Sequence, residues 1–141
     1  MIVLLVRHAR AGKRSKWEGD DRLRPLDKRG RKQAEGLVSL LAEYPIDRIA
    51  SSPYLRCTQT VDPLAASRGL AVEERDELAE GSKRADVQRL LEELDAGCVV
   101  LCTHGDVVDE LAGSELPKGS TQVLEAENGR LTPREYLAPP V

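Results

Sequence analysis

The sequence predicts a single α/β domain: a three-layer sandwich with a mostly parallel central sheet, helices on both faces and an antiparallel C-terminal edge. Two short apolar runs, Ile2 to Val6 and Val99 to Cys102, end abruptly at polar residues, as strands buried on both faces do. Segments with helical spacing of apolar residues separate the predicted strands. Near the C-terminus, Asn128-Gly129 lies between two strand-like runs and is a strong hairpin signal. This order of elements indicates the sandwich.

The sequence predicts strands at 2–6, 48–50, 70–73, 99–102, 122–126 and 130–136, and helices at 27–43, 54–68, 84–94 and 107–112. Asp27 is expected to cap the first helix. Ser51 or Ser52 is expected to cap the second, with a proline at its first position. Pro63 should break or kink this second helix, which should stop at Gly69.

Composition and charge narrow the class of protein. The chain has 141 residues, 40% hydrophobic and 32% charged, which suits one soluble globular domain. We expect this domain to span 1–137, with a loose tail at 138–141. A net charge of -3 argues against a protein that binds nucleic acid polymers. The segment 7–32 is nevertheless basic, either to attract an anionic substrate or simply as a solvated surface.

Cysteine usage predicts a reduced, cytoplasmic protein. Cys98 and Cys102 are four residues apart on a predicted strand, hence about 13 Å apart and too distant for a disulfide. The apolar run at the N-terminus is too short for a signal peptide, and no stretch approaches the roughly 18 apolar residues of a membrane span. We therefore expect no membrane partner.

Polar residues that suit phosphate chemistry follow three of the predicted strands. Arg7 and His8 follow the first, Arg56 lies just beyond the second, and His104 follows the strand at 99–102. Open α/β sheets bind ligands at the carboxyl ends of their strands. A guanidinium stays charged and its planar fork matches phosphate oxygens. Two guanidinium groups would repel a metal ion, so we expect neither metal nor another cofactor. The alternative for each histidine alone is that it merely caps its strand and forms local hydrogen bonds.

Four motifs in order carry a resemblance to a known family. They are Arg7-His8-Ala9, Pro25-Leu26 with Gly30, Gln33 and Ala34, Ser51-Ser52-Pro53 with Arg56, Gln59 and Thr60, and Thr103-His104-Gly105. Together they resemble the histidine phosphatase superfamily, which has the phosphoglycerate mutase-like fold, over most of the chain. The short length looks like the phosphohistidine phosphatase branch, and also like the phosphatase domain fused behind Nudix domains in some bacterial hydrolases. One departure is Ala9, where the family usually has glycine.

The resemblance implies a role for each site residue. His8 would attack phosphorus and form a phosphohistidine, which requires its other ring nitrogen to donate to a backbone carbonyl or a carboxylate. Arg7, Arg56 and protonated His104 would hold the phosphoryl oxygens. Glu80, two residues after a leucine, is the candidate that protonates the leaving group, and Glu77 is the fallback. Without such an acid, a phosphoramidate substrate would be favoured.

Three functions are compatible with these residues. The first is a metal-independent phosphatase acting on a phosphohistidine protein or a small phosphomonoester. The second is a nucleotide or polyphosphate phosphatase, suggested by the likeness to the Nudix-associated domain and by Trp17, which could stack on a base. The third is a non-catalytic module that binds phosphorylated ligands. A chain this compact is expected to be a monomer or a weak oligomer.

Overall fold

The structure is a computed structural model that describes residues 1–140. Its strands are β1 (Ile2–Arg7), β2 (Arg48–Ser51), β3 (Val72–Glu74), β4 (Cys98–Thr103), β5 (Thr121–Glu127) and β6 (Arg130–Leu137). Its helices are α1 (Lys28–Leu40), α2 (Leu55–Arg68), α3 (Arg84–Leu94) and α4 (Gly105–Ala112), with three short 3-10 turns, η1 (Arg14–Lys16), η2 (Asp21–Leu23) and η3 (Asp76–Leu78).

The strands form one six-stranded sheet in the order β3-β2-β4-β1-β5-β6. The first four strands of that order pair in parallel, whereas β5 and β6 are antiparallel to their neighbours. The hairpin between β5 and β6 turns at Asn128 and Gly129, whose φ angles of 54° and 76° are the positive values that a tight two-residue turn requires. The predicted mixed sheet with an antiparallel C-terminal edge is therefore confirmed.

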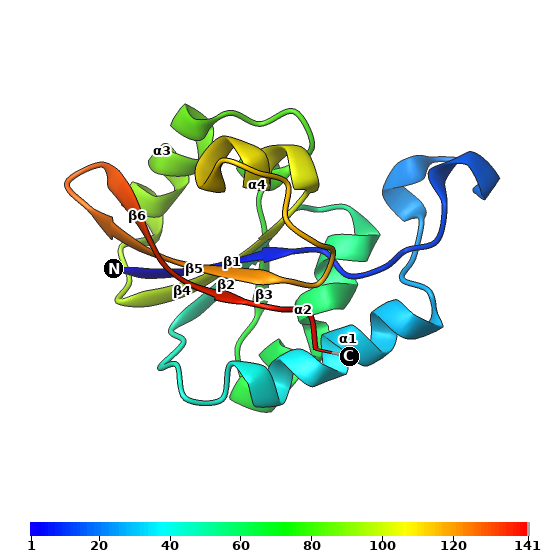
Figure 1. Cartoon of the computed structure of the whole chain (residues 1–141), viewed down its shortest axis with the longest axis horizontal. Coiled ribbons are helices and arrows are strands. Elements are labelled where there is room, and N and C mark those ends of the chain that lie inside the picture. Colours follow the sequence, from blue (N-terminus) through cyan, green and yellow to red (C-terminus); the bar gives the residue numbers. More distant parts are fainter. Residues whose placement is uncertain (141) are drawn as a thin grey trace.

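Helices cover both faces of the sheet, with α3 and α4 on one side and α1 and α2 on the other (Figure 1). Successive residues of β1 pack alternately into the two cores. Val3 and Leu5 pack in the core that includes α3 and α4. Leu4 and Val6 pack in the core that includes α1 and α2. All four are at most 1% exposed. A strand buried on both faces has no polar positions, which explains its uninterrupted apolar sequence.

The predicted cap of the second helix is wrong. Helix α2 begins at Leu55, its N-cap is Tyr54, and no side chain caps it. The physical reason is that the hydroxyl of Ser52 lies 2.8 Å from Nε2 of His104, while the hydroxyl of Ser51 donates to the backbone carbonyl of Ser52. The Ser52 oxygen accepts its backbone hydrogen bond from the amide of the N-cap residue Tyr54, at 3.2 Å, so neither serine caps the first turn of α2.

Other helix ends match the sequence. Asp27 caps α1 by accepting a hydrogen bond from the backbone nitrogen of Gly30, at 2.8 Å. Gly69 ends α2 in the left-handed conformation, with φ of 65°. Pro63 does not break α2, which continues through it to Arg68.

The segment 7–25, which connects β1 to α1, carries the short turns η1 and η2. It extends beyond the carboxyl end of β1, at the right of Figure 1. Its backbone joins the first turn of α1, because the amide of Asp27 donates to the carbonyl of Arg10 at 3.0 Å. A Cβ atom on Gly30 would lie only 1.9 Å from the same carbonyl oxygen. Glycine at this position therefore lets the loop lie directly on the helix.

Cys57, Cys98 and Cys102 are buried free thiols, as the spacing of the latter two predicted.

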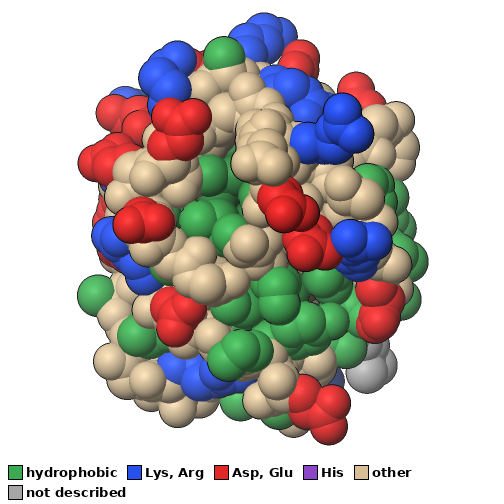
Figure 2. All heavy atoms as spheres, turned by 90° about the vertical axis from the view of Figure 1, so that its left-hand side faces the viewer, with side chains coloured by type: hydrophobic (Ala, Val, Ile, Leu, Met, Phe, Trp, Pro, Cys, Tyr) green, Lys and Arg blue, Asp and Glu red, His purple; other side chains and the backbone are tan. Residues whose placement is uncertain are grey.

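Hydrophobic side chains gather on the face of the molecule near the N-terminus (Figure 2). Some of them surround a hollow of about 250 Å³ that Met1, Leu91 and Leu131 help to line. No helix within residues 1–140 is long and apolar enough to cross a membrane.

The domain boundary at residue 137 stays a prediction. In the expected tail, Pro140 lies against α1: a Cβ atom on Gly36 would be 2.6 Å from that of Pro140. Val141, the last residue of the tail, lies outside the described residues.

Candidate active site

The two histidines meet at the carboxyl edge of the sheet. Strands β1 and β4 pair in register with Arg7 opposite Thr103, and the backbone amide of His8 donates to the carbonyl of Thr103. The residue that follows each strand therefore lies beside its counterpart. The rings of His8 and His104 are 5.5 Å apart, edge to face. The predicted convergence of the strand ends is confirmed, and a cleft of about 650 Å³ opens over them.

His8 is held in the form that a nucleophile requires. Its Nδ1 lies 2.8 Å from the backbone carbonyl of Ala9, so Nδ1 carries the proton and Nε2 keeps its lone pair. The predicted bond from its second nitrogen to a carbonyl is confirmed. Burial, reinforced by the nearby charges of His104, Arg56 and Arg7, lowers the pKa of His8 to about 3. The imidazole is therefore neutral at physiological pH.

His104 contacts the segment that precedes α2 on one side and the Glu80 carboxylate on the other. Its Nε2 is 2.8 Å from the Ser52 hydroxyl, and its Nδ1 is 3.5 Å from Oε1 of Glu80. The ring of Tyr54 packs against it edge to face, with centroids 4.6 Å apart. The imidazole is only 2% exposed, so its orientation is fixed by these contacts.

Arg56 is fully buried, and its donors face carboxylates. Nη1 donates to the backbone carbonyl of Asp21 at 2.9 Å, and Nη2 donates to the Asp21 carboxylate at 3.1 Å and to Glu80 at 2.8 Å. Within residues 1–140 its Nε has no hydrogen-bond partner. A fixed guanidinium with a free donor is suited to hold an anion.

Arg7 lines the cleft, and its side chain is held by the loop before β5. Its Nη1 donates to the carbonyl of Leu116 at 2.5 Å and lies 4.0 Å from Glu115. A Cβ atom on Gly105 would be 2.8 Å from the guanidinium carbon of Arg7, so glycine at the start of α4 makes room for this side chain. Its buried Nε is also unpartnered in the part of the chain that the structure describes.

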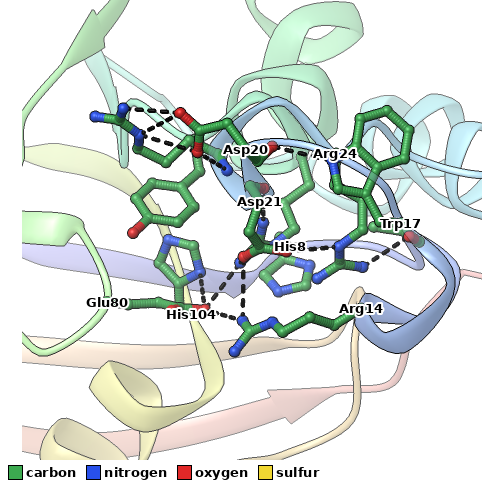
Figure 3. Close-up of polar contacts among 12 residues, drawn as sticks. His8, Arg14, Trp17, Asp20, Asp21, Arg24, Glu80 and His104 are labelled. Atoms are coloured by element: carbon green, nitrogen blue, oxygen red, sulfur yellow. Dashed lines mark hydrogen bonds and ion pairs between the residues drawn. The ribbon is translucent and has the colours of Figure 1, made fainter.

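Of the two candidate acids, the structure brings only Glu80 to the cleft. Its Oε1 accepts hydrogen bonds from Arg56 and, at 2.5 Å, from Nη2 of Arg14 (Figure 3). Glu77 is turned away and pairs with Arg75 at 2.8 Å. In this arrangement the Glu80 carboxylate is an acceptor held by two guanidinium groups.

Three residues of the segment 7–25 belong to the site and escaped the sequence analysis: Arg14, Asp21 and Arg24. Asp21 joins them, since its carboxylate lies 3.3 Å from Arg14, 2.9 Å from Arg24 and 3.1 Å from Arg56 (Figure 3). Arg24 is only 6% exposed and donates to the carbonyl of Ala11 at 2.7 Å. An arginine next to the Pro25-Leu26 motif was the only signal that could have indicated this network.

The remaining motif residues hold the backbone of the site. The amide of Ala9 donates to the Thr60 hydroxyl at 2.9 Å, and that of Arg10 donates to the Gln33 side chain at 3.1 Å. Gln59 accepts from the amide of Leu26 at 2.8 Å. Ala9, which replaces the usual glycine, is fully buried, so its methyl group is accommodated.

No group of three or more His, Cys, Asp or Glu side chains within residues 1–140 is arranged to hold a metal ion. The cleft itself carries several cationic side chains. Arg7, Arg14, Arg24, Lys13 and Lys118 all line it.

Comparison with known proteins agrees with this geometry. Residues 3–85 match the histidine phosphatase superfamily (branch 1). An 8-oxo-(d)GTP phosphatase from Mycolicibacterium smegmatis is 40% identical over 157 aligned positions, which cover 98% of this chain and 48% of the relative. This chain thus spans about half the length of that relative.

Solved structures show the same fold. The protein histidine phosphatase SixA, solved in complex with tungstate, superposes with a TM-score of 0.81 at 24% identity, covering 99% of this chain and 97% of its own. An alpha-ribazole phosphatase from Shigella flexneri gives a TM-score of 0.76 at 18% identity, covering 95% of each chain. The sheet order, the paired histidines and the match over residues 3–85 lead to one conclusion: the chain belongs to the histidine phosphatase superfamily, branch 1, and is a phosphatase of that superfamily.

Proposed function

We propose that this protein is a nucleotide phosphatase that works through a phosphohistidine on His8. The observation that carries the proposal is the 40% identity, over 98% of this chain, to an 8-oxo-(d)GTP phosphatase. This favours the nucleotide or polyphosphate function over the phosphohistidine protein or small phosphomonoester that the sequence put first. The basic cleft suits a substrate that carries several negative charges.

The proposed reaction has two displacements. Nε2 of His8 attacks the terminal phosphorus, the bond from phosphorus to the bridging oxygen breaks, and the leaving group departs with the electron pair. A water molecule then attacks the phosphohistidine, releasing inorganic phosphate and the imidazole. Arg7, Arg56 and His104 hold the phosphoryl oxygens as negative charge develops on them. Positive charge that a metal would supply elsewhere comes from the two guanidinium groups.

The surroundings of Glu80 bear on the leaving group. Arg14 and Arg56 both donate to Oε1 of Glu80, so a proton for the leaving group would have to come from the other carboxyl oxygen. Leaving groups that are stable as anions, such as a nucleoside phosphate, depend least on an acid. We therefore expect phosphoanhydrides to be better substrates than alkyl monoesters, with Glu80 as the candidate acid for the latter.

The contacts of Glu80 with two arginines also support a second candidate function, the hydrolysis of phosphohistidine in a protein. There the ring leaves as neutral imidazole when its other nitrogen has been protonated, and no acid then has to act on the leaving nitrogen itself. The two functions differ in the size and chemistry of the substrate and can be separated directly.

The test is a substrate panel in EDTA: 8-oxo-dGTP, dGTP, a phosphohistidine-containing protein and p-nitrophenyl phosphate, with released phosphate as the readout. We expect the nucleotides to give the highest kcat/KM, and His8→Ala to abolish turnover of every substrate. Quenching in alkali during turnover should trap a phosphoenzyme in the wild type only, and this phosphoenzyme should be stable in alkali and labile in acid. Turnover of the phosphohistidine protein alone would reject the nucleotide assignment, and turnover undiminished in His8→Ala would reject the nucleophile.

A further inference from the structure

A second hollow adjoins the catalytic cleft. Its volume is about 630 Å³, and the side chains of Arg10, Lys13, Arg29 and Lys118 line it. We call these four residues the basic annex. Gly12, Lys13 and Lys118 line both hollows, so the two are continuous.

The annex is tied to the nucleophile through the backbone. The amide of Gly119, the residue after Lys118, donates to the carbonyls of Arg7 and His8 at 3.0 and 3.1 Å. Arg10 follows His8 by two residues, and its carbonyl accepts from Asp27 at the start of the helix that carries Arg29. The four cations therefore come from three segments. The segment of Lys118 is bonded to the strand end itself, and the helix of Arg29 is bonded to Arg10, three residues beyond it.

Most of the positive charge in the annex has no carboxylate partner among the described residues. Within residues 1–140, Lys13, Arg29 and Lys118 form no side-chain hydrogen bond or ion pair, and Arg10 has one carboxylate, Asp27, at 3.7 Å. The arginines that line the catalytic cleft, in contrast, each have a carboxylate partner at 4.0 Å or less. Burial, with the charges of Arg7, Arg24 and Arg10, lowers the pKa of Lys118, as expected where cations outnumber anions.

Resting on the proposed function, we propose that the basic annex binds a second phosphate group of the substrate, next to the phosphoryl group that reacts at His8. Unpaired cations around a hollow next to a phosphate site are suited to a polyanion whose charges are only a bond or two apart. The protein would then select nucleoside di- or triphosphates over monophosphates. The annex contributes binding and orientation, and the chemistry stays with His8.

Simple electrostatic steering is the competing explanation of these charges. Steering acts at long range, raises the rate of association of every anion and is screened by salt. A subsite acts by contact and discriminates between one phosphate group and two. The comparison of inorganic pyrophosphate with orthophosphate separates the two explanations without using a nucleotide.

The experiment measures both anions as inhibitors of p-nitrophenyl phosphate hydrolysis by the wild type, or by titration calorimetry if that substrate is not turned over. We expect pyrophosphate to bind about tenfold more tightly than orthophosphate. In Arg29→Ala that preference should fall to about threefold or less, while orthophosphate affinity changes little. Lys118 also lines the catalytic cleft, so Lys118→Ala should weaken both anions, and pyrophosphate more than orthophosphate. Lys32→Ala, which removes an exposed charge from the same helix as Arg29, is the matched control and should keep the preference.

Two results would overturn the subsite. One is a wild type that binds both anions equally well, and the other is a pair of variants that weaken both anions by the same factor, as steering predicts. These results do not depend on whether nucleotides are hydrolysed. A protein that prefers pyrophosphate but turns over no nucleotide would reject the proposed function and keep the subsite.

Discussion

The buried, neutral state of His8 predicts a specific loss of stability in acid. Its pKa is about 3 in the folded protein against 6.5 for an unperturbed histidine. Between these values the unfolded chain binds a proton that the native state does not bind, so stability falls as pH decreases from 6.5 toward 3 and is fully present above 6.5. At pH 5, which is 1.5 units below 6.5, the loss is about 2 kcal/mol, because each unit corresponds to about 1.4 kcal/mol.

The measurement is urea unfolding of the wild type and of His8→Asn at pH 7 and pH 5. Other groups titrate in both proteins and cancel in the comparison. We expect the wild type to lose about 2 kcal/mol more than the variant between the two pH values. NMR of the imidazole carbons provides a direct check, since the chain has only two histidines and the variant assigns one of them. An ordinary His8 would be about 3% neutral at pH 5, and this one is expected to be about 99% neutral.

A difference below about 0.5 kcal/mol, or an NMR titration of His8 between pH 6 and 7, would refute the reasoning. Either result would show that burial does not keep the His8 imidazole neutral in the native state. The nucleophile would then depend on pH like any exposed histidine.

Three further predictions concern the rest of the site. Arg56→Ala should lower kcat/KM by about 10²–10³-fold, since it removes donors from the developing charge. Arg56→Lys should not restore the rate, because its single ammonium group cannot replace the planar guanidinium fork. Near-normal rates in either variant would contradict the assigned role. Glu80→Gln should slow phenyl phosphate hydrolysis more than p-nitrophenyl phosphate hydrolysis, whose leaving group needs less acid, whereas equal effects would remove Glu80 as the acid. Gly30→Ala should lower the free energy of unfolding by about 1–3 kcal/mol, because the new methyl group meets the Arg10 carbonyl at 1.9 Å, and a melting temperature like that of Lys32→Ala would show that the loop yields freely.

The sheet and the paired histidines could be predicted because their signals are local. Four or more consecutive apolar residues mark β1 and β4 wherever their partners lie. Parallel pairing then brings the residues after the strands to one edge, so His8 and His104 share that edge once both strands are recognised. They are neighbours there because β1 pairs directly with β4. The Asn128-Gly129 turn was equally local, since positive φ angles are a property of those residue types.

The contacts of the segment 7–25 could not be predicted for the opposite reason. Asp21 receives its partners from three places in the chain, namely Arg14, Arg24 and Arg56, and no periodicity indicates which of several charged neighbours turns inward. The wrong cap at Ser52 has the same origin. A hydroxyl before a helix ordinarily bonds to that helix, but here His104, 52 residues away in the chain, takes the bond.

The carboxylates beside Arg56 determine which anions the cleft can admit. Asp21 and Glu80 occupy the donors that a phosphoryl group would use, so an incoming anion must take over these hydrogen bonds. Arg24 holds Asp21 and Arg14 holds both carboxylates, and these arginines can keep them in place when Arg56 turns to the substrate. The exchange replaces one set of charge-assisted bonds with another, and its net gain is therefore small. Affinity must come from groups that form no ion pair beforehand. The unpaired cations of the basic annex satisfy that condition, so a second phosphate group should add affinity that the exchange at Arg56 does not supply.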